Sequence, residues 1–217
     1  MNQPNDKLID AKQKLAQKNA ARGVGTGHDA PAQRERLPAG QRLVSGWPVL
    51  DLGLQPEIPL NEWSLEVLGA AQRQVFSWQD FLKLPQTKLT TDFHCVTSWS
   101  IFDSKVEGVL WSDFMAATHA DPNSTHVMFH SYDGYSTNVP LKDLMEDPQA
   151  MLIHSWGGAP LERIHGGPVR GWIPSLYAWK SAKWVKGIEF MLKDKRGFWE
   201  VRGYHNHGDP WKEERYS

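Results

Sequence analysis

Cys95 is the only cysteine among the 217 residues, and its thiol is the side chain here with the widest chemistry. A single cysteine excludes an intrachain disulfide framework and any zinc or iron–sulfur site that needs several cysteines. The sequence also lacks the Cys-x-x-Cys-His run of covalent haem attachment. Two interpretations stay open: an inert buried side chain, which is the commoner case, or a thiolate that reacts or binds a metal.

The segment LERIHGGPVR, residues 161–170, combines paired glycines with an arginine. Gly166 and Gly167 let backbone amides approach an anion closely, and the Arg170 guanidinium can form paired hydrogen bonds with a phosphate. Lys180 and Lys183 follow shortly after and add positive charge. The pattern predicts a phosphate-binding loop, and a glycine-rich surface loop with solvated charges is an equally open interpretation.

Other residues with potential chemistry have simpler interpretations. His205 and His207 match two ligands of a metal site on a strand, but a third ligand is missing, so a solvated or capping pair is favoured. The sequence contains eleven tryptophans. Most of them are expected in the core or in a pocket wall rather than in a redox relay.

Short strands are predicted to position these residues. Alternating apolar and polar residues indicate a strand at residues 63–67, and a stretch rich in threonine and aromatic residues indicates another at 87–96, which brings Cys95 to a strand end. Further strands are expected at residues 127–129, 150–153, 184–192 and 198–201, the last two paired through a turn near residues 194–197.

Short helices are expected between the strands. Ser77 and Asp80 have the spacing of a capping box before a helix that Pro85 closes. Ser112 is predicted to cap a second helix, and Pro140 to begin a third. The glycine- and proline-rich residues 157–174 are expected to form a loop. These elements together predict an α+β domain with mixed β-sheets and short helices.

The composition supports one packed domain. The chain is 40% hydrophobic and its formal net charge is −1, which argues against nucleic acid as a partner. No apolar run is long enough to span a membrane, and no secretory signal is visible, so a cytoplasmic location is expected. Residues 1–41 are polar and are predicted to be a mobile tail with one short helix at 7–21, and residues 42–217 are predicted to form the domain.

Four sequence blocks occur in the order typical of one family. They are DFHCVTSWS at residues 92–100, SYDGY at 131–135, HGGPVR at 165–170 and YAWKSAKW at 177–184. The chain from about residue 43 onward resembles the sulfite oxidase-like molybdopterin oxidoreductases, in particular their small single-domain bacterial members. The resemblance implies the sulfite oxidase molybdopterin-binding fold and a molybdenum–molybdopterin cofactor.

The resemblance also implies which residues form the site. Cys95 is expected to bind molybdenum, and a soft thiolate in a cationic environment, which would keep it deprotonated, suits a sulfur-rich metal centre. Tyr135, Trp99 and His94 are expected to contact the substrate or support the site, and His94 is also expected to bind the cofactor. The remaining residues expected around the pterin and its phosphate are Ser131, His165, Arg170, Trp179, Lys180 and Lys183, with GWPVL at residues 46–50 lining the pterin pocket. At position 165 many relatives have asparagine, so histidine is a departure from the family pattern.

The expected activity is two-electron oxygen-atom transfer on a small substrate that contains sulfur or nitrogen. Sulfite oxidation needs several cations around a dianion, but between Cys95 and Trp111 the only basic residue is Lys105. Reduction of a sulfoxide or N-oxide therefore stays open as an alternative to sulfite oxidation. A separate electron-transfer protein is expected as a partner. The alternatives are a non-redox binding module and a carrier of the molybdenum cofactor.

Overall fold

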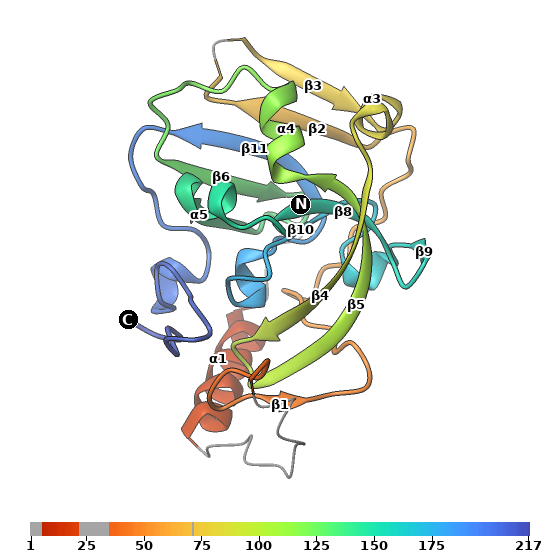
Figure 1. Ribbon diagram of the computed structural model, residues 1–217. Helices are drawn as coiled ribbons and strands as arrows, with labels where there is room; N and C mark the ends of the chain where they lie inside the picture. The colour runs from red at the N-terminus through yellow and green to blue at the C-terminus, as the bar shows by residue number, and fades with distance from the viewer. Residues whose placement is uncertain (1–5, 22–34, 71) are drawn as a thin grey trace.

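The computed structural model describes residues 6–21, 35–70 and 72–217 of the chain. Its main elements form two mixed β-sheets (Figure 1). The six-stranded sheet contains β1 (Arg42–Leu43), β4 (Thr87–Cys95), β5 (Trp99–Leu110), β8 (Met151–Trp156), β9 (Ala159–Pro160) and β10 (Arg170–Trp172). The five-stranded sheet has the spatial order β3 (Gln74–Ser77), β2 (Ser64–Leu68), β11 (Val185–Met191), β6 (His126–Ser131) and β7 (Ser136–Pro140).

The helices are few and mostly short. They are α1 (Asp6–Ala21), α3 (Trp78–Lys83), α4 (Trp111–Ala117) and α5 (Leu141–Glu146), with single 3-10 turns η1 (Arg163–His165), η2 (Ala178–Lys180) and η3 (Glu200–Arg202). Most strand pairs are antiparallel, but β1 runs parallel to β5 and β2 parallel to β11. The predicted α+β domain with mixed sheets is confirmed. No helix within the described ranges has the length and apolar character needed to cross a bilayer.

Two apolar clusters hold the sheets together. The larger one joins the sheets, because Val109 and Leu152 of the six-stranded sheet pack with Phe129 and Ile188 of the five-stranded sheet. The second cluster contains Phe93, Cys95, Trp99, Trp172, Trp179 and Tyr204. Cys95 therefore lies in an aromatic cluster at one end of the β4–β5 pair. Figure 1 shows this pair extending to the lower end of the molecule, where β1 and α1 lie.

Several predicted elements agree with the structure. Helix α3 begins after Ser77, whose side chain accepts a hydrogen bond from the Asp80 amide while Asp80 bonds back to the Ser77 amide, as in a capping box. The strand predicted at residues 87–96 is β4, and the strands near 63–67, 127–129 and 150–153 are β2, β6 and β8. Helix α5 follows Pro140 as predicted.

Other predictions were wrong. Ser112 does not cap helix α4, because that helix begins at Trp111 and its N-cap residue, Leu110, offers no side-chain acceptor. Residues 198–201 do not form a strand paired with β11, because β11 already has β2 and β6 as neighbours and the later segment turns into η3. The glycine-rich residues 157–174 are not all loop, since they contain β9, η1 and β10.

Helix α1 coincides with the short helix expected near residues 7–21, and it contacts the rest of the chain. Ile9 is 3% exposed, and Ala16 is fully buried. The Gln13 side chain donates a hydrogen bond to the Arg202 carbonyl oxygen, and the Lys12 ammonium pairs with Asp51. The helix is therefore packed on the domain. Residues 1–5 and 22–34 of the predicted tail lie outside the described residues, and the division at residue 41 stays a prediction.

Candidate active site

Cys95 lies at the end of β4, next to the turn that leads into β5. The Ser98 amide donates to the Cys95 carbonyl oxygen, and Ser98 has a φ of 71°, so the chain reverses within three residues. In the resulting antiparallel pair, Cys95 is directly opposite Trp99. Cross-strand partners project to the same side of a sheet, so Trp99 lies beside the thiol as expected.

The thiol opens into a pocket formed by segments that are distant in sequence. Its lining includes Trp47, Pro48, Leu50 and Leu52 from the segment before β2, Phe93, Cys95, Thr97 and Trp99 from the β4–β5 pair, Asp133 and Tyr135 from the β6–β7 turn, and Arg170, Trp179, Lys183, Trp199 and Tyr204 from the later part of the chain. The expectation that residues 46–50 line the pocket agrees with this lining. Lys12 of helix α1 and Asp51 also face it.

The Cys95 thiol has one close polar neighbour and two nearby cations. Its Sγ lies 3.2 Å from the Thr97 hydroxyl. Burial raises the pKa of Cys95, and the Thr97 hydrogen bonds and the charges of Arg215 and Arg170 oppose this only in part. In the protein without a metal, burial therefore outweighs the effect of the cations on this thiol.

Arg170 is buried near Cys95, with its guanidinium held by backbone oxygens. It donates to the carbonyls of Gly171, His165 and Ser181 through Nε and one N–H of each terminal nitrogen. Burial lowers the pKa of Arg170 to about 9. Within the described ranges it forms no ion pair with a carboxylate. A buried cation without a counter-charge favours an anion in the pocket that it lines.

Lys183 and Arg215 are two further cations whose side chains donate to backbone carbonyl oxygens. The Lys183 ammonium donates to the Ile164 carbonyl oxygen, and burial, together with repulsion from Arg170, lowers the pKa of Lys183 to about 7. Arg215 donates to the carbonyl oxygens of Val96 and Ala39. Neither residue has a carboxylate partner in the part of the chain that the structure describes. Sequence reasoning missed Arg215 because 120 positions separate it from Cys95 and only the fold brings them together.

His165 and Ser131 have polar side-chain atoms without hydrogen-bond partners among the described residues. The imidazole of His165 stacks on Trp47 with ring centroids 4.1 Å apart, and its Nδ1 has no partner. Burial, and then Arg170 and Lys183, lower the pKa of His165 to about 4, so the ring is neutral near pH 7. Its unpartnered nitrogen suits a polar group of a ligand. Both residues are buried, and neither is among those that line the pocket.

Two predicted site residues lie elsewhere. His94 points away from Cys95, because neighbouring residues of a strand face opposite sides, and its Nδ1 lies 2.8 Å from the Ser100 hydroxyl. Lys180 is fully buried outside the pocket lining, where its ammonium pairs with Glu200 and donates to the carbonyl oxygens of Asn138 and Asn206. Neither residue, both of which were expected to bind the cofactor, lines the pocket beside Cys95.

The glycine loop also differs from its predicted form. The amides of Gly166 and Gly167 donate to the carbonyl oxygens of Arg163 and Glu162, so they are not directed at a bound anion. A side chain at Gly166 would meet Lys183, and one at Gly167 would meet the Leu161 carbonyl oxygen. These glycines therefore permit close packing that places Lys183, and the cations rather than the amides supply the positive charge.

Tyr135 and Trp179 line the pocket, and the polar groups of both side chains are engaged. The Tyr135 hydroxyl donates to the Trp179 carbonyl oxygen at 2.6 Å, and the Trp179 indole donates to Glu200 at 2.9 Å. The two residues therefore act as walls of the pocket in this structure.

His205 and His207, the histidine pair of the sequence, contact carboxylates. His207 bonds to Asp143 and Glu214. Among the described residues, no group of three or more His, Cys, Asp or Glu side chains could hold a metal ion.

The comparisons with known proteins identify the family of this chain. The family model of the oxidoreductase molybdopterin-binding domain matches residues 52–199. The chain is 36% identical over 187 residues to the uncharacterized oxidoreductase YuiH of Bacillus subtilis, a match that covers 85% of this chain and 94% of YuiH. It is 24% identical to human mitochondrial sulfite oxidase, over 69% of this chain and 33% of that protein.

Two further matches extend the range of relatives. A putative protein-methionine-sulfoxide reductase subunit, YedZ1 of Azospira oryzae, is 27% identical over 69% of this chain and 56% of its own length. Among solved structures, the sulfane dehydrogenase SoxCD from Paracoccus pantotrophus aligns with a TM-score of 0.58 and 20% identity, over 64% of this chain and 40% of that one. The structural likeness supports the fold, and the chain spans only a part of these larger relatives.

Proposed function

Because the chain belongs to the oxidoreductase molybdopterin-binding domain family, with sulfite oxidases among its relatives, we propose that it binds a molybdenum–pterin cofactor and catalyses two-electron oxygen-atom transfer. The observation that carries the proposal is one pocket that joins the only thiol of the chain to buried Arg170 and partly buried Lys183, neither of which has a carboxylate partner among the described residues. Such a pocket fits a ligand with both a thiolate-binding metal and an anionic group.

The side chains divide the binding of the cofactor between them. Cys95 would bind molybdenum through its thiolate, with the Thr97 hydroxyl beside the sulfur to orient it. Arg170 and Lys183 line the pocket and would attract the anionic part. His165, which stacks on the pocket residue Trp47 and has an unpartnered Nδ1, would form a hydrogen bond with the pterin. When bound, this cofactor supplies the two-electron redox change and the transfer of the oxygen atom.

Aromatic residues shape the space next to Cys95. Trp99, Trp179, Trp199 and Tyr204 line the pocket, while Arg170 and Arg215 direct their hydrogen bonds mainly at backbone oxygens. An aromatic wall excludes water and favours a substrate with an apolar substituent over a small bare dianion. The proposed substrate class is therefore a small S- or N-oxide that is reduced, with sulfite oxidation as the second candidate.

Electrons must reach or leave this site through another protein. The single cysteine excludes a cysteine-ligated iron–sulfur cluster in the same chain. We therefore propose a separate electron-transfer protein as the partner. The other two candidate functions are distinguishable: a non-redox module binds no pterin, and a carrier holds the pterin but converts no substrate.

Steady-state assays on the loaded protein test the proposed reaction. Dimethyl sulfoxide, methionine sulfoxide and trimethylamine N-oxide are assayed with a reduced viologen, and sulfite with an electron acceptor. We expect turnover of at least one oxide, and loss of about three orders of magnitude in kcat for Cys95→Ser. Full molybdenum-dependent activity of Cys95→Ser would contradict the proposal. Turnover of sulfite and of none of the oxides would show that the reaction is sulfite oxidation and not the reduction of an S- or N-oxide.

A further inference from the structure

A buried ion pair lies directly behind the aromatic wall of the pocket. Lys180 and the side chain of Glu200 are both fully shielded from solvent, and the ammonium lies 2.7 Å from Glu200 Oε1. Neither residue lines the pocket, yet each is the chain neighbour of a tryptophan that does: Trp179 precedes Lys180, and Trp199 precedes Glu200. The pair therefore connects the two turns, η2 and η3, that carry this part of the wall.

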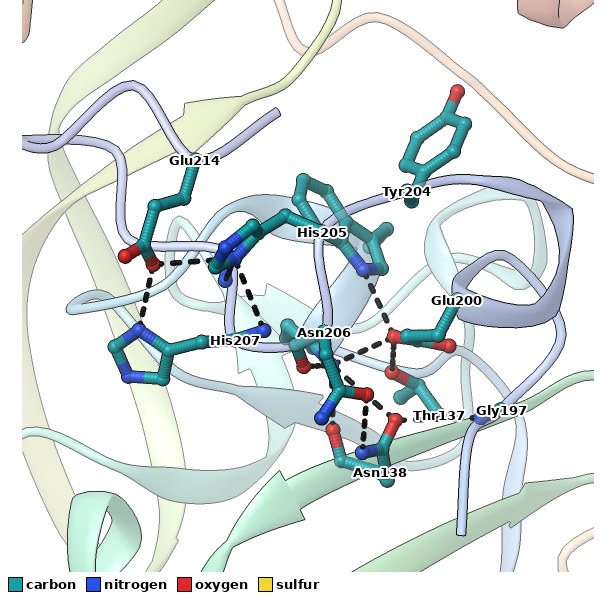
Figure 2. Close-up of polar contacts among 12 residues, drawn as sticks. Thr137, Asn138, Gly197, Glu200, Tyr204, His205, Asn206, His207 and Glu214 are labelled. Carbon is teal, nitrogen blue, oxygen red and sulfur yellow. Dashed lines mark hydrogen bonds and ion pairs between the residues drawn. The ribbon is translucent and has the colours of Figure 1, made fainter. Parts of the chain in front are cut away.

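Glu200 Oε1 is the point where three elements meet. It accepts hydrogen bonds from the Trp179 indole at 2.9 Å and from the Thr137 hydroxyl of β7 at 2.8 Å, besides its contact with Lys180. Figure 2 shows the hydrogen bond between Thr137 and the Glu200 carboxylate as a dashed line. The second oxygen, Oε2, has no partner among the described residues. The polar contacts of this carboxylate thus converge on one oxygen.

Lys180 contacts the same carboxylate oxygen that accepts from the indole. Its ammonium also donates to the carbonyl oxygens of Asn138 and Asn206 at 2.7 and 2.6 Å. Asn138 and Asn206 are in turn bonded to each other and to Asp194, as Figure 2 shows for the two asparagines. The acceptor of the indole N–H is therefore held by a network that reaches the five-stranded sheet.

The ring of Trp179 is also confined by its apolar neighbours. Tyr177 stacks on it with centroids 5.4 Å apart, and Tyr204 meets it edge-on at 5.2 Å. A side chain at Gly208 would collide with the indole, so the backbone there approaches the ring closely. These contacts restrict the ring, and the hydrogen bond to Glu200 selects which edge of the indole points away from the pocket.

A buried ion pair is a weak source of stability, because the desolvation of both charges offsets their attraction. The contact of this pair that matters for the pocket is the hydrogen bond from the Trp179 indole to the charged Glu200 carboxylate. We propose that Glu200 is a positioning residue for the reaction: its Oε1 orients the Trp179 indole beside Cys95, and Lys180 holds that carboxylate in place. The proposal rests on the proposed function only for its consequence in catalysis.

The orientation is tested by nuclear magnetic resonance of the indole N–H groups. The eleven tryptophans give separate indole signals, and Trp179→Phe identifies one of them by its loss. A hydrogen bond to a carboxylate shifts such a proton downfield and slows its exchange with solvent. In Glu200→Gln, which replaces the charged acceptor by a neutral amide, we expect this signal to move upfield and its exchange to quicken by about tenfold or more.

Thr137→Val is the matched control. It removes another buried donor to the same Oε1 and leaves the indole and its acceptor in place. The Trp179 signal should stay near its wild-type position in this variant. An unchanged Trp179 signal in folded Glu200→Gln would overturn the proposal, as would an equal shift in both variants.

The catalytic consequence is a change in KM, measured on the substrate that the wild type converts best. A loosened wall weakens substrate binding, so Trp179→Phe and Glu200→Gln should each raise KM by roughly tenfold and change kcat less. Trp179→Phe retains the ion pair and so covers the case in which Glu200→Gln fails to fold. An unchanged KM in Trp179→Phe would overturn the catalytic part. Absence of turnover in the wild type would count against the proposed function. The indole signal of Trp179 would still show whether Glu200 orients this ring.

Discussion

Cys95 derives its proposed role from its surroundings, because burial raises rather than lowers the pKa of its thiol. A reactive nucleophilic cysteine usually has a lowered pKa, so the protein alone does not activate this thiol. A metal ion displaces the proton of a coordinating thiol directly. The burial of Cys95 beside an anion-attracting pocket is therefore consistent with a metal ligand and less so with an independent nucleophile.

Lys183 offers a test of the anion-binding end of the pocket. Lys183→Met should accelerate loss of the pterin from the loaded protein by about tenfold, measured as extracted pterin per chain during dialysis. Because burial and Arg170 bring the pKa of Lys183 to about 7, its ammonium is more fully protonated at pH 6 than at pH 8. The advantage of the wild type over the variant should therefore be larger at pH 6.

The matched control for this prediction is Lys186→Met. Lys186 is exposed and lies over the Tyr132 ring, outside the pocket lining. Its replacement should leave the pterin content unchanged at both pH values. Equal losses in the two variants would show that general surface charge, and not the charge of Lys183 in the pocket, retains the cofactor.

At the scale of elements, the β4–β5 pair matters most, since it carries both Cys95 and Trp99. The sequence allowed β4 to be predicted from its threonines and aromatic residues, but β5 was not predicted. The burial along β5 does not alternate regularly, and its ladder with β8 is interrupted by a register shift at Glu107 and Gly108. Such an irregularity removes the period-two signal on which a strand prediction depends.

Gly108 provides the element-scale prediction. A Cβ at this position would lie 2.0 Å from the Leu152 carbonyl oxygen of β8, so a methyl group would push the two strands apart. Gly108→Ala should lower the free energy of unfolding by at least about 2 kcal/mol in urea denaturation. Gly46→Ala is the control, because no described atom lies within 4 Å of the place its methyl group would take, and it should stay within about 1 kcal/mol of the wild type. A similar effect of both substitutions would refute this explanation of the β5–β8 contact.

At the scale of the whole molecule, the pocket is made from segments that only the complete fold brings together. The four motifs and the fold class were accessible from the sequence, because each motif is local and the elements have recognisable patterns. The roles of Lys180, His94 and Arg215 were not. Lys180 belongs to the same motif as Lys183, yet its ion pair with Glu200 holds it behind the aromatic wall of the pocket. Arg215, from the C-terminal segment, donates to the carbonyl oxygen of Val96, the residue after Cys95.

Helix α1 illustrates the same limit. Its composition predicted a tail, since few apolar residues are available to anchor it. The structure instead buries Ile9 and Ala16, and it places Lys12 at the pocket with Asp51 as its partner. The burial of these two residues depends on the rest of the fold, which no local pattern of residues records.

The central claim is that this chain holds molybdenum in the Cys95 pocket through a pterin. Elemental analysis of protein purified from a host that makes the cofactor, combined with mass measurement of the extracted pterin, tests it most directly. We predict about one molybdenum atom and one pterin per chain. A chain without either component, while a reference molybdenum enzyme produced in the same host is fully loaded, would contradict it.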